Sequence, residues 1–194
     1  KEGDRGRWWL HADSTDKITV FASNGRFYTL AADKLPRGRG TGEPVKLMAD
    51  LSDASIVDVR VHRADGQLLV ASSDGRGFLV DESYTLAQTR QGRQVMNLGR
   101  GDARAVVCVN AEGDTVAVIG DNRKLLLFAL SELSVLPRGR GVLLQRYKDG
   151  GLADAKVFVC KLELLNIPRQ QVYNHSIAVV YYCIFKLGFA ELKN

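Results

Sequence analysis

Arginine and glycine alternate in loops that recur along this chain. Residues 35–40 and 136–141 both read Leu-Pro-Arg-Gly-Arg-Gly, and residues 89–94 carry a reduced form, Thr-Arg-Gln-Gly-Arg-Gln. A guanidinium group keeps its charge and presents a planar fork of donors that matches a phosphate. Glycine between the arginines lets the backbone approach a surface closely, and successive amide groups in such a loop can form an anion-binding concavity. The pattern indicates a surface that binds a polyanion.

Ten basic residues lie in these loops or beside them. The main candidates for phosphate contacts are Arg37, Arg39, Arg138 and Arg140, the weaker second loop adds Arg90 and Arg93, and the flanking residues are Lys34, Lys46, Arg100 and Arg146. Contacts of this kind position a nucleic acid but do not read its sequence. The alternative interpretation is that glycine only makes tight connections and arginine only keeps them soluble.

Each loop follows two strand-like stretches that flank a polar turn. Apolar residues alternate along residues 16–30, 66–80 and 114–128, as the period of a strand requires. Asn-Gly and Asp-Gly at the first two turns predict hairpins in which both central residues have positive φ. On this alignment the matched turn positions are Gly25, Gly75 and Asn122, and the matched loop glycines are Gly38, Gly92 and Gly139.

The repeat length predicts the fold class. Further strands are expected at residues 55–62 and 103–110, which gives about four strands in a unit of about 50 residues, the size of one propeller blade. Helical periodicity is nearly absent from residues 1–157. We therefore predict an all-β, propeller-like array of about three four-stranded units over that range.

The last part of the chain departs from this pattern. Residues 158–194 contain one of the seventeen arginines and one of the nineteen glycines, so the turn and loop signals stop near Phe158. Two explanations remain open. The segment is either an apolar element that packs on the last unit or a sequence foreign to the repeat, and we assign it no function.

Composition is compatible with a nucleic-acid partner without requiring one. The net charge is +5 over 194 residues, and 45% of the residues are hydrophobic. The three cysteines have neither paired nor metal-ligand spacing, which favours a reducing compartment. The longest apolar run, residues 177–185, is too short to span a bilayer as a helix. We expect a soluble cytoplasmic protein with no membrane partner.

No group of residues in the sequence suggests catalysis. The Arg/Gly loops match neither the P-loop nor the dinucleotide-binding pattern, and no helix is expected after them. The histidines His11, His62 and His175 are isolated, and no His/Cys/Asp cluster has metal-ligand spacing. We expect no catalytic residue, no metal and no cofactor, and therefore a binding domain and not an enzyme.

The repeat unit resembles a known family. Asn24-Gly25-Arg-Phe-Tyr-Thr-Leu30, followed by the loop at 35–40 and by Pro44-Val45, is similar to the repeat of the C-terminal domain of bacterial type IIA topoisomerase A subunits. The second and third units continue the likeness, which covers about residues 1–157. Gyrase A subunits carry a fuller Gln-Arg-Arg-Gly-Gly-Lys-Gly box, whereas the loops here are degenerate. The likeness is therefore greatest to the topoisomerase IV type.

This resemblance implies both a fold and a function. The fold would be a β-pinwheel, in which neighbouring four-stranded blades exchange strands. The outer rim would bind and bend duplex DNA and present it to a separate breakage-reunion core, next to the bacterial nucleoid. The implied partners are duplex DNA, that catalytic core and the ATPase subunit, while the family's catalytic tyrosine would lie outside this chain. A propeller-type scaffold whose loops contact an acidic protein is the alternative function.

Overall fold

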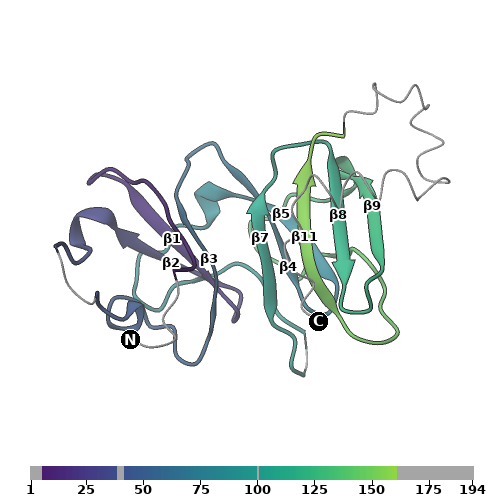
Figure 1. The fold of residues 1–194 in the computed structure, drawn as a ribbon, viewed down its shortest axis with the longest axis horizontal. Coiled ribbons are helices and arrows are strands. Elements are labelled where there is room, and N and C mark those ends of the chain that lie inside the picture. Colours follow the sequence, from purple (N-terminus) through teal and green to yellow (C-terminus); the bar gives the residue numbers. More distant parts are fainter. Residues whose placement is uncertain (1–5, 39–41, 100, 161–194) are drawn as a thin grey trace.

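Three small antiparallel sheets follow one another along the chain (Figure 1). The computed structural model describes residues 6–38, 42–99 and 101–160. Blade 1 contains, in spatial order, β3 (Ile56–Val61), β1 (Lys17–Ala22), β2 (Arg26–Ala31) and β6 (Arg93–Gln94). Blade 2 contains β10 (Val142–Leu143), β5 (Arg76–Asp81), β4 (Gln67–Ser72) and β7 (Ala105–Asn110). Blade 3 contains β11 (Leu152–Phe158), β8 (Thr115–Gly120) and β9 (Leu125–Ala129).

Strand exchange joins each blade to the next unit of sequence. In blade 1 the strand β6, at the end of the second Arg/Gly loop, pairs with β2 through Phe27 and Arg93. In blade 2 the strand β10, which follows the third loop, pairs with β5 through Gly77 and Val142. The fourth strand of a blade is therefore supplied by the Arg/Gly loop of the following unit. The predicted β-pinwheel is confirmed, and the strands expected at 55–62 and 103–110 correspond to β3 and β7.

The third sheet has three strands among the described residues, so the outer edge of β9 differs from that of β2 and β5. Tyr28, Phe78 and Leu126 occupy equivalent positions opposite Val20, Val70 and Val118 in their hairpins. Tyr28 and Phe78 are buried, whereas Leu126 is 40% exposed. Pairing with an exchanged strand therefore accompanies burial of the outer strand.

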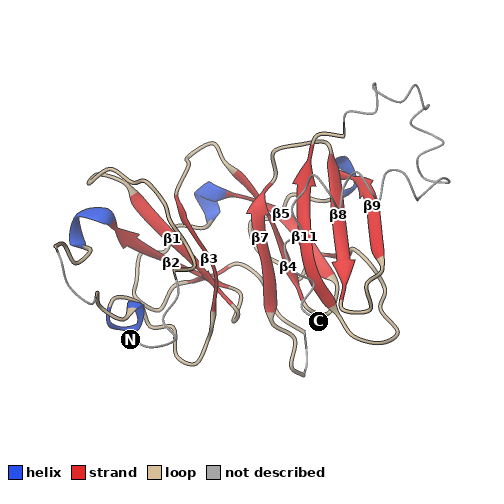
Figure 2. Ribbon diagram, in the orientation of Figure 1, coloured by secondary structure: helices blue, strands red, loops and turns tan. Residues whose placement is uncertain are grey.

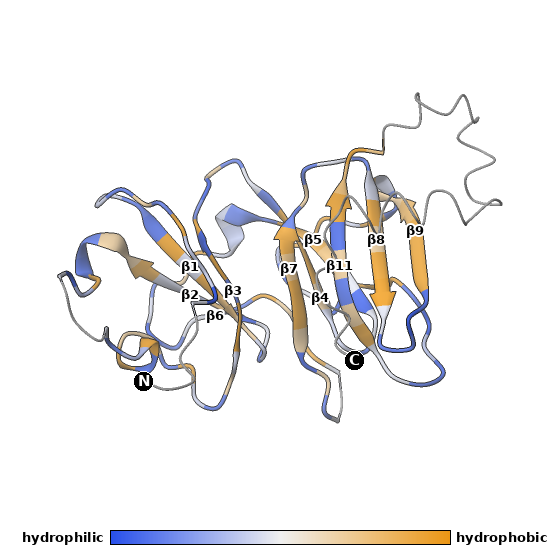
Figure 3. Ribbon diagram, viewed as in Figure 1, coloured by the Kyte–Doolittle hydropathy of each residue, from blue (hydrophilic) through white to orange (hydrophobic). Residues whose placement is uncertain are grey.

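The apolar cores lie between neighbouring blades, because alternate residues of a strand face opposite sides of its sheet. Leu68 and Val70 of β4 pack in a cluster with Phe21 and Phe27 of blade 1. Their neighbours Leu69 and Ala71 belong to a second cluster that contains Val116, Val118, Leu152 and Ala155 of blade 3. Figure 3 shows the corresponding apolar runs along β4, β7, β8 and β9.

The hairpin turns differ from the expected type. In all three, the first and fourth residues of the turn are hydrogen bonded, from Gly25 N to Ala22 O, Gly75 N to Ser72 O and Arg123 N to Gly120 O, each at 2.9 Å. Only the last residue of each turn has positive φ, at 76° in Gly25, 79° in Gly75 and 62° in Arg123. The expectation of two central residues with positive φ was therefore wrong. Each hairpin is a type I turn followed by a left-handed bulge residue.

The third turn is also aligned one residue later than expected. Asn122 Oδ1 accepts a 3.1 Å hydrogen bond from Lys124 N, as Asn24 Oδ1 does from Arg26 N. Asn122 therefore corresponds to Asn24, and Arg123 occupies the left-handed position that glycine fills in the other two turns. The prediction matched Asn122 to Gly25 because asparagine also tolerates the left-handed conformation.

The helical content of the described residues is limited to four short 3-10 helices (Figure 2). Three of them follow the hairpins at equivalent positions, and they are η1 (Ala32–Lys34), η3 (Glu82–Tyr84) and η4 (Leu130–Glu132). The fourth, η2 (Val45–Leu47), follows the first Arg/Gly loop. In the described part of the chain, none of these helices has the length or apolarity needed to cross a membrane. Of the segment 158–194, residues from 161 onward lie outside the described residues.

Candidate nucleic-acid interface

The hairpin turn of each complete blade is docked on the backbone that follows the next Arg/Gly loop. Gly25 O of blade 1 accepts hydrogen bonds from Val95 N at 3.2 Å and Met96 N at 3.0 Å. Gly75 O of blade 2 accepts one from Leu144 N at 2.8 Å. A Cβ atom on Gly25 would lie 2.3 Å from Met96 O. Glycine is therefore required at this turn for backbone contact as well as for positive φ.

An arginine beside each turn fixes the loop itself. Arg26 donates from NH1 to Gln91 O of the second loop at 3.0 Å, and Arg76 donates from NH1 to Gly141 O of the third loop at 3.2 Å. Charged donors make the stronger hydrogen bonds in proteins. Neither residue was assigned a role from the sequence. The Gly-Arg pair that recurs at 25–26 and 75–76 is the feature from which this role could have been predicted. Both arginines therefore hold the backbone of a loop on the preceding blade.

The matched loop glycines are not those chosen from the sequence. Gly42, Gly92 and Gly141 share left-handed φ values of 74°, 72° and 75° and lie 50 and 49 positions apart. A Cβ atom on Gly92 would lie 2.8 Å from Phe27 O, and one on Gly141 would lie 2.2 Å from Gly77 O, which is the equivalent carbonyl of the next blade. The alignment on Gly38, Gly92 and Gly139 was wrong because the Leu-Pro-Arg-Gly-Arg-Gly motif ends two residues before Gly42 in the first unit but ends at Gly141 in the third, so the same letters occupy different positions.

Hydrogen bonds join the second and third loops to the segment that follows the loop before each of them. Asp50 N, which follows the first loop, donates to Arg90 O of the second at 2.8 Å, and the Arg90 guanidinium donates to Leu47 O. In the same way, Asn97 N, which follows the second loop, donates to Gly139 O of the third at 2.7 Å. The second and third loops therefore lie side by side, each joined to the segment that follows the loop before it, and they form a continuous edge of the molecule.

The side chains predicted for phosphate contact are exposed wherever the structure describes them. These are Lys34, Arg37, Lys46, Arg90, Arg93, Arg138, Arg140 and Arg146. Arg39 and Arg100 lie outside the described residues. Within the described part of the chain, the side chains of Arg37 and Arg146 make no hydrogen bond or ion pair, and the Arg93 guanidinium lies over the Tyr84 ring at 5.9 Å. Most of this charge is therefore directed toward solvent.

Two arginines of the third loop have polar partners. Arg138 donates from Nε to Asn97 Oδ1 at 3.3 Å, and Arg140 NH2 lies 3.0 Å from Asp74 Oδ2. Partial burial alone would raise the pKa of Asp74, but hydrogen bonds from Ser72 and Arg140 outweigh it and hold that pKa below its usual value. Asp74 is therefore a charged carboxylate in the middle of a basic edge.

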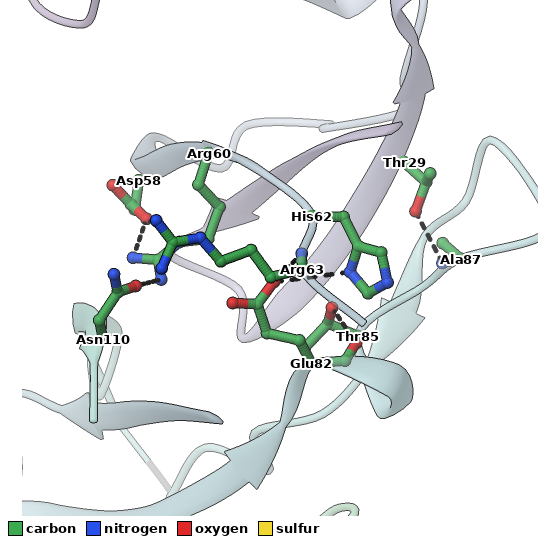
Figure 4. A network of polar contacts seen from close by, with 9 residues as sticks. All are labelled: Thr29, Asp58, Arg60, His62, Arg63, Glu82, Thr85, Ala87 and Asn110. Atoms are coloured by element: carbon green, nitrogen blue, oxygen red, sulfur yellow. Dashed lines mark hydrogen bonds and ion pairs between the residues drawn. The ribbon is translucent and has the colours of Figure 1, made fainter. Parts of the chain in front are cut away.

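A second polar cluster lies between blades 1 and 2, away from these loops (Figure 4). Arg60 on β3 donates to Asp58 Oδ2 at 2.6 Å and to Asn110 Oδ1 and Cys108 O of β7 at 2.5 and 2.9 Å. The buried Glu82 carboxylate accepts a 2.9 Å hydrogen bond from Arg63 N and lies 3.5 Å from His62 Nδ1. His62 is therefore not isolated, as the sequence had suggested.

The role of this cluster is to connect two blades. Burial raises the pKa of the Cys108 thiol, which keeps the thiol protonated despite the nearby Arg60. Burial works against the charge of Arg60, but the carboxylates of Asp58 and Glu82 favour that charge, and the pKa of the guanidinium is raised. Among the described residues, no three His, Cys, Asp or Glu side chains are grouped so that they could hold a metal ion. The cluster links two blades through hydrogen bonds.

Comparisons with known proteins agree with the geometry. The family described as DNA gyrase C-terminal domain, beta-propeller, matches residues 16–63, 66–110 and 114–153, one segment for each repeat. The A subunit of DNA topoisomerase 4 from Caulobacter vibrioides is 48% identical over 159 residues, and that from Rickettsia felis is 44% identical over 158 residues. Each alignment covers 81% of this chain and 21% of the relative, so the chain spans about a fifth of their length.

Solved structures show the same architecture. The C-terminal domain of Escherichia coli ParC superimposes with a TM-score of 0.71 at 26% identity, over 76% of this chain and 64% of that one. A DNA gyrase A C-terminal domain superimposes with a TM-score of 0.55 at 16% identity, over 76% of this chain and 47% of that one, and supports the fold alone. Because its three repeats match the family model and its relatives are topoisomerase IV A subunits, the chain belongs to the DNA gyrase A C-terminal domain family.

Proposed function

We propose that residues 1–157 form a non-catalytic module that binds duplex DNA through its sugar-phosphate backbone and bends it. The main observation in support is that the second and third Arg/Gly loops lie side by side, and that the described basic side chains of all three loops are exposed. Glycines at the loops allow close approach, and exposed guanidinium groups provide permanent charge. Contacts of this kind tolerate any base sequence, because they reach phosphates and not base edges.

The module would act as part of a larger enzyme. Its relatives are named as topoisomerase 4 A subunits and are about five times longer than the matched segment. We propose that the bent DNA is presented to the breakage-reunion core of such an A subunit, which works with a separate ATPase subunit in the bacterial cytoplasm. DNA topology and chromosome segregation would then be influenced by which DNA segment the rim presents.

The test is a titration of this chain with a fluorescent duplex at several salt concentrations, together with a bending assay. Each phosphate neutralised should add about 0.9 to the slope of log affinity against log salt. Arg37→Ala combined with Arg39→Ala should therefore lower the slope by about 2 and weaken binding to all sequences alike.

The matched control removes the same charge from residues outside the Arg/Gly loops. Lys17 lies at the end of β1 far from the turn, and Arg63 pairs with Glu112 at 2.7 Å after β3. Lys17→Ala combined with Arg63→Ala should leave the salt slope almost unchanged. Equal losses in both double variants would contradict the loop assignment. If the unaltered chain had no affinity for duplex DNA, the protein-scaffold alternative would replace the proposal.

A further inference from the structure

The ion pair between Asp74 and Arg140 is specific to one of the two junctions at which a loop docks on a blade. Aligned on the equivalent glycines Gly92 and Gly141, Arg140 of the third loop corresponds to Gln91 of the second. In the turns, Asp74 corresponds to Asn24. One junction therefore has two neutral amide side chains where the other has a carboxylate and a guanidinium. Arg140 therefore adds no net charge to the edge, because the Asp74 carboxylate balances it.

The position of the pair is fixed by three separate segments. Arg140 NH2 lies 3.0 Å from Asp74 Oδ2, and the two side chains are 50% and 27% exposed. Gly99, from the segment that follows the second loop, packs against both groups. A Cβ atom there would lie 2.5 Å from Arg140 NH2 and 3.1 Å from Asp74 Oδ2. Ser72 Oγ donates to Asp74 Oδ1 and holds the carboxylate in this orientation.

We infer that Asp74 attenuates the affinity of the third Arg/Gly loop for DNA phosphates by holding Arg140 in a neutral pair, an inference that rests on the proposed function. A phosphate that approached Arg140 would also approach the Asp74 carboxylate, and the two anions would repel each other. A paired arginine also releases fewer counterions on binding than a free one, because its charge is already balanced. The third loop then contributes mainly through Arg138, although its sequence is identical to that of the first.

The test variant is Asp74→Asn, because asparagine fills the equivalent position in the other two turns. Asn24 and Asn122 occupy the position of Asp74 in the other two turns, and each accepts the same backbone hydrogen bond at 3.1 Å. Asp74→Asn should therefore preserve the turn and remove only the charge. The measurement is the affinity of this chain for a fluorescent duplex across a salt series. We expect affinity to rise about three- to tenfold at low salt and the slope to steepen by about 0.9.

Two further variants separate this effect from a general change in charge. Asp65 is exposed in the turn between β3 and β4, at the other end of the blades, so Asp65→Asn changes the net charge equally and should leave affinity almost unchanged. Arg140→Gln should weaken binding in the unaltered chain, because it leaves the Asp74 carboxylate unpaired on the edge, and it should abolish the gain in the Asp74→Asn background.

The outcomes distinguish the inference from the function on which it rests. An Asp74→Asn variant that binds as the unaltered chain does, or more weakly, overturns the inference, and so does an equal gain in Asp65→Asn. If Arg37 and Arg39 still control binding in that case, the proposed function stands. If the unaltered chain fails to bind duplex DNA, the proposed function falls with the inference.

Discussion

The two junctions between a blade and the following loop share a backbone plan and differ in their side chains. At both, the turn glycine accepts hydrogen bonds from the loop backbone, and the next arginine donates to a loop carbonyl. Asp74 and Arg140 form an ion pair at the second junction, and the equivalent residues at the first junction are the neutral amides Asn24 and Gln91. Assembly of the blades therefore depends on backbone contacts, which leaves the charge of each loop free to vary.

The largest expected effect breaks the shared backbone plan. Alanine at Gly25 or Gly75 would place Cβ 2.3 or 2.5 Å from a loop carbonyl oxygen, at a φ value that alanine rarely adopts. Each substitution should destabilise the fold by about 3 kcal/mol, from left-handed strain and steric overlap together. The measurement is urea unfolding.

Gly101 provides the control for backbone strain alone. Its φ is +82°, and nothing lies within 4 Å of its Cβ direction, so Gly101→Ala should cost only about 1–2 kcal/mol. If Gly25→Ala cost no more than Gly101→Ala, the turn would not be in tight contact with the loop, and the shared plan would be wrong.

A smaller effect should follow when the arginine contact is removed. Arg26→Met and Arg76→Met each eliminate one donor to a loop carbonyl while keeping most of the apolar stem, and each should cost about 1 kcal/mol in unfolding free energy. Lys124 occupies the equivalent position in the third turn, where no loop pairs with β9 among the described residues. Lys124→Met should therefore have almost no effect, and a similar cost at all three positions would contradict the positioning role.

The smallest effect distinguishes the two junctions by pH. The folded pKa of Asp74 lies below its ordinary value of 3.8, so the unfolded chain binds more protons between those two values. The stabilisation from the pair with Arg140 is therefore present above pH 3.8 and is lost as pH falls through the lowered pKa. The unfolding free energy of Asp74→Asn should depend less steeply on pH in this acid range. Identical profiles for the two proteins would show that the pair does not contribute to folding.

Much of the fold could be predicted from residue order. Alternating apolar residues, turn signals and a period near 50 residues indicated strands, hairpins and blades, because these features depend on contacts between near neighbours. The exact turn type and the third alignment could not be predicted in this way. Asparagine is compatible with more than one turn geometry, so the left-handed position of the third turn was assigned to Asn122, one residue before Arg123, which occupies it.

For the candidate site, the sequence predicted which basic residues take part but not the contacts that they make. The arginines of the loops could be listed from the sequence, but Arg26 and Arg76 could not be separated from them as positioning residues. The partner of Arg140 could not be predicted either, because Asp74 lies 66 residues away in the chain. These relations depend on strand exchange, which brings a loop onto the turn of the preceding blade.

By itself, the order of residues determined that this chain forms repeated β-units with basic, glycine-rich loops. Local periodicity and backbone preference act over a few residues, so they can be recognised before the chain folds. The equivalence of the glycines, the arginines that hold the loops and the arginine that is paired with a carboxylate become visible when the blades are assembled. Those properties arise where segments about 50 to 70 residues apart meet, and their distances depend on how the blades pack.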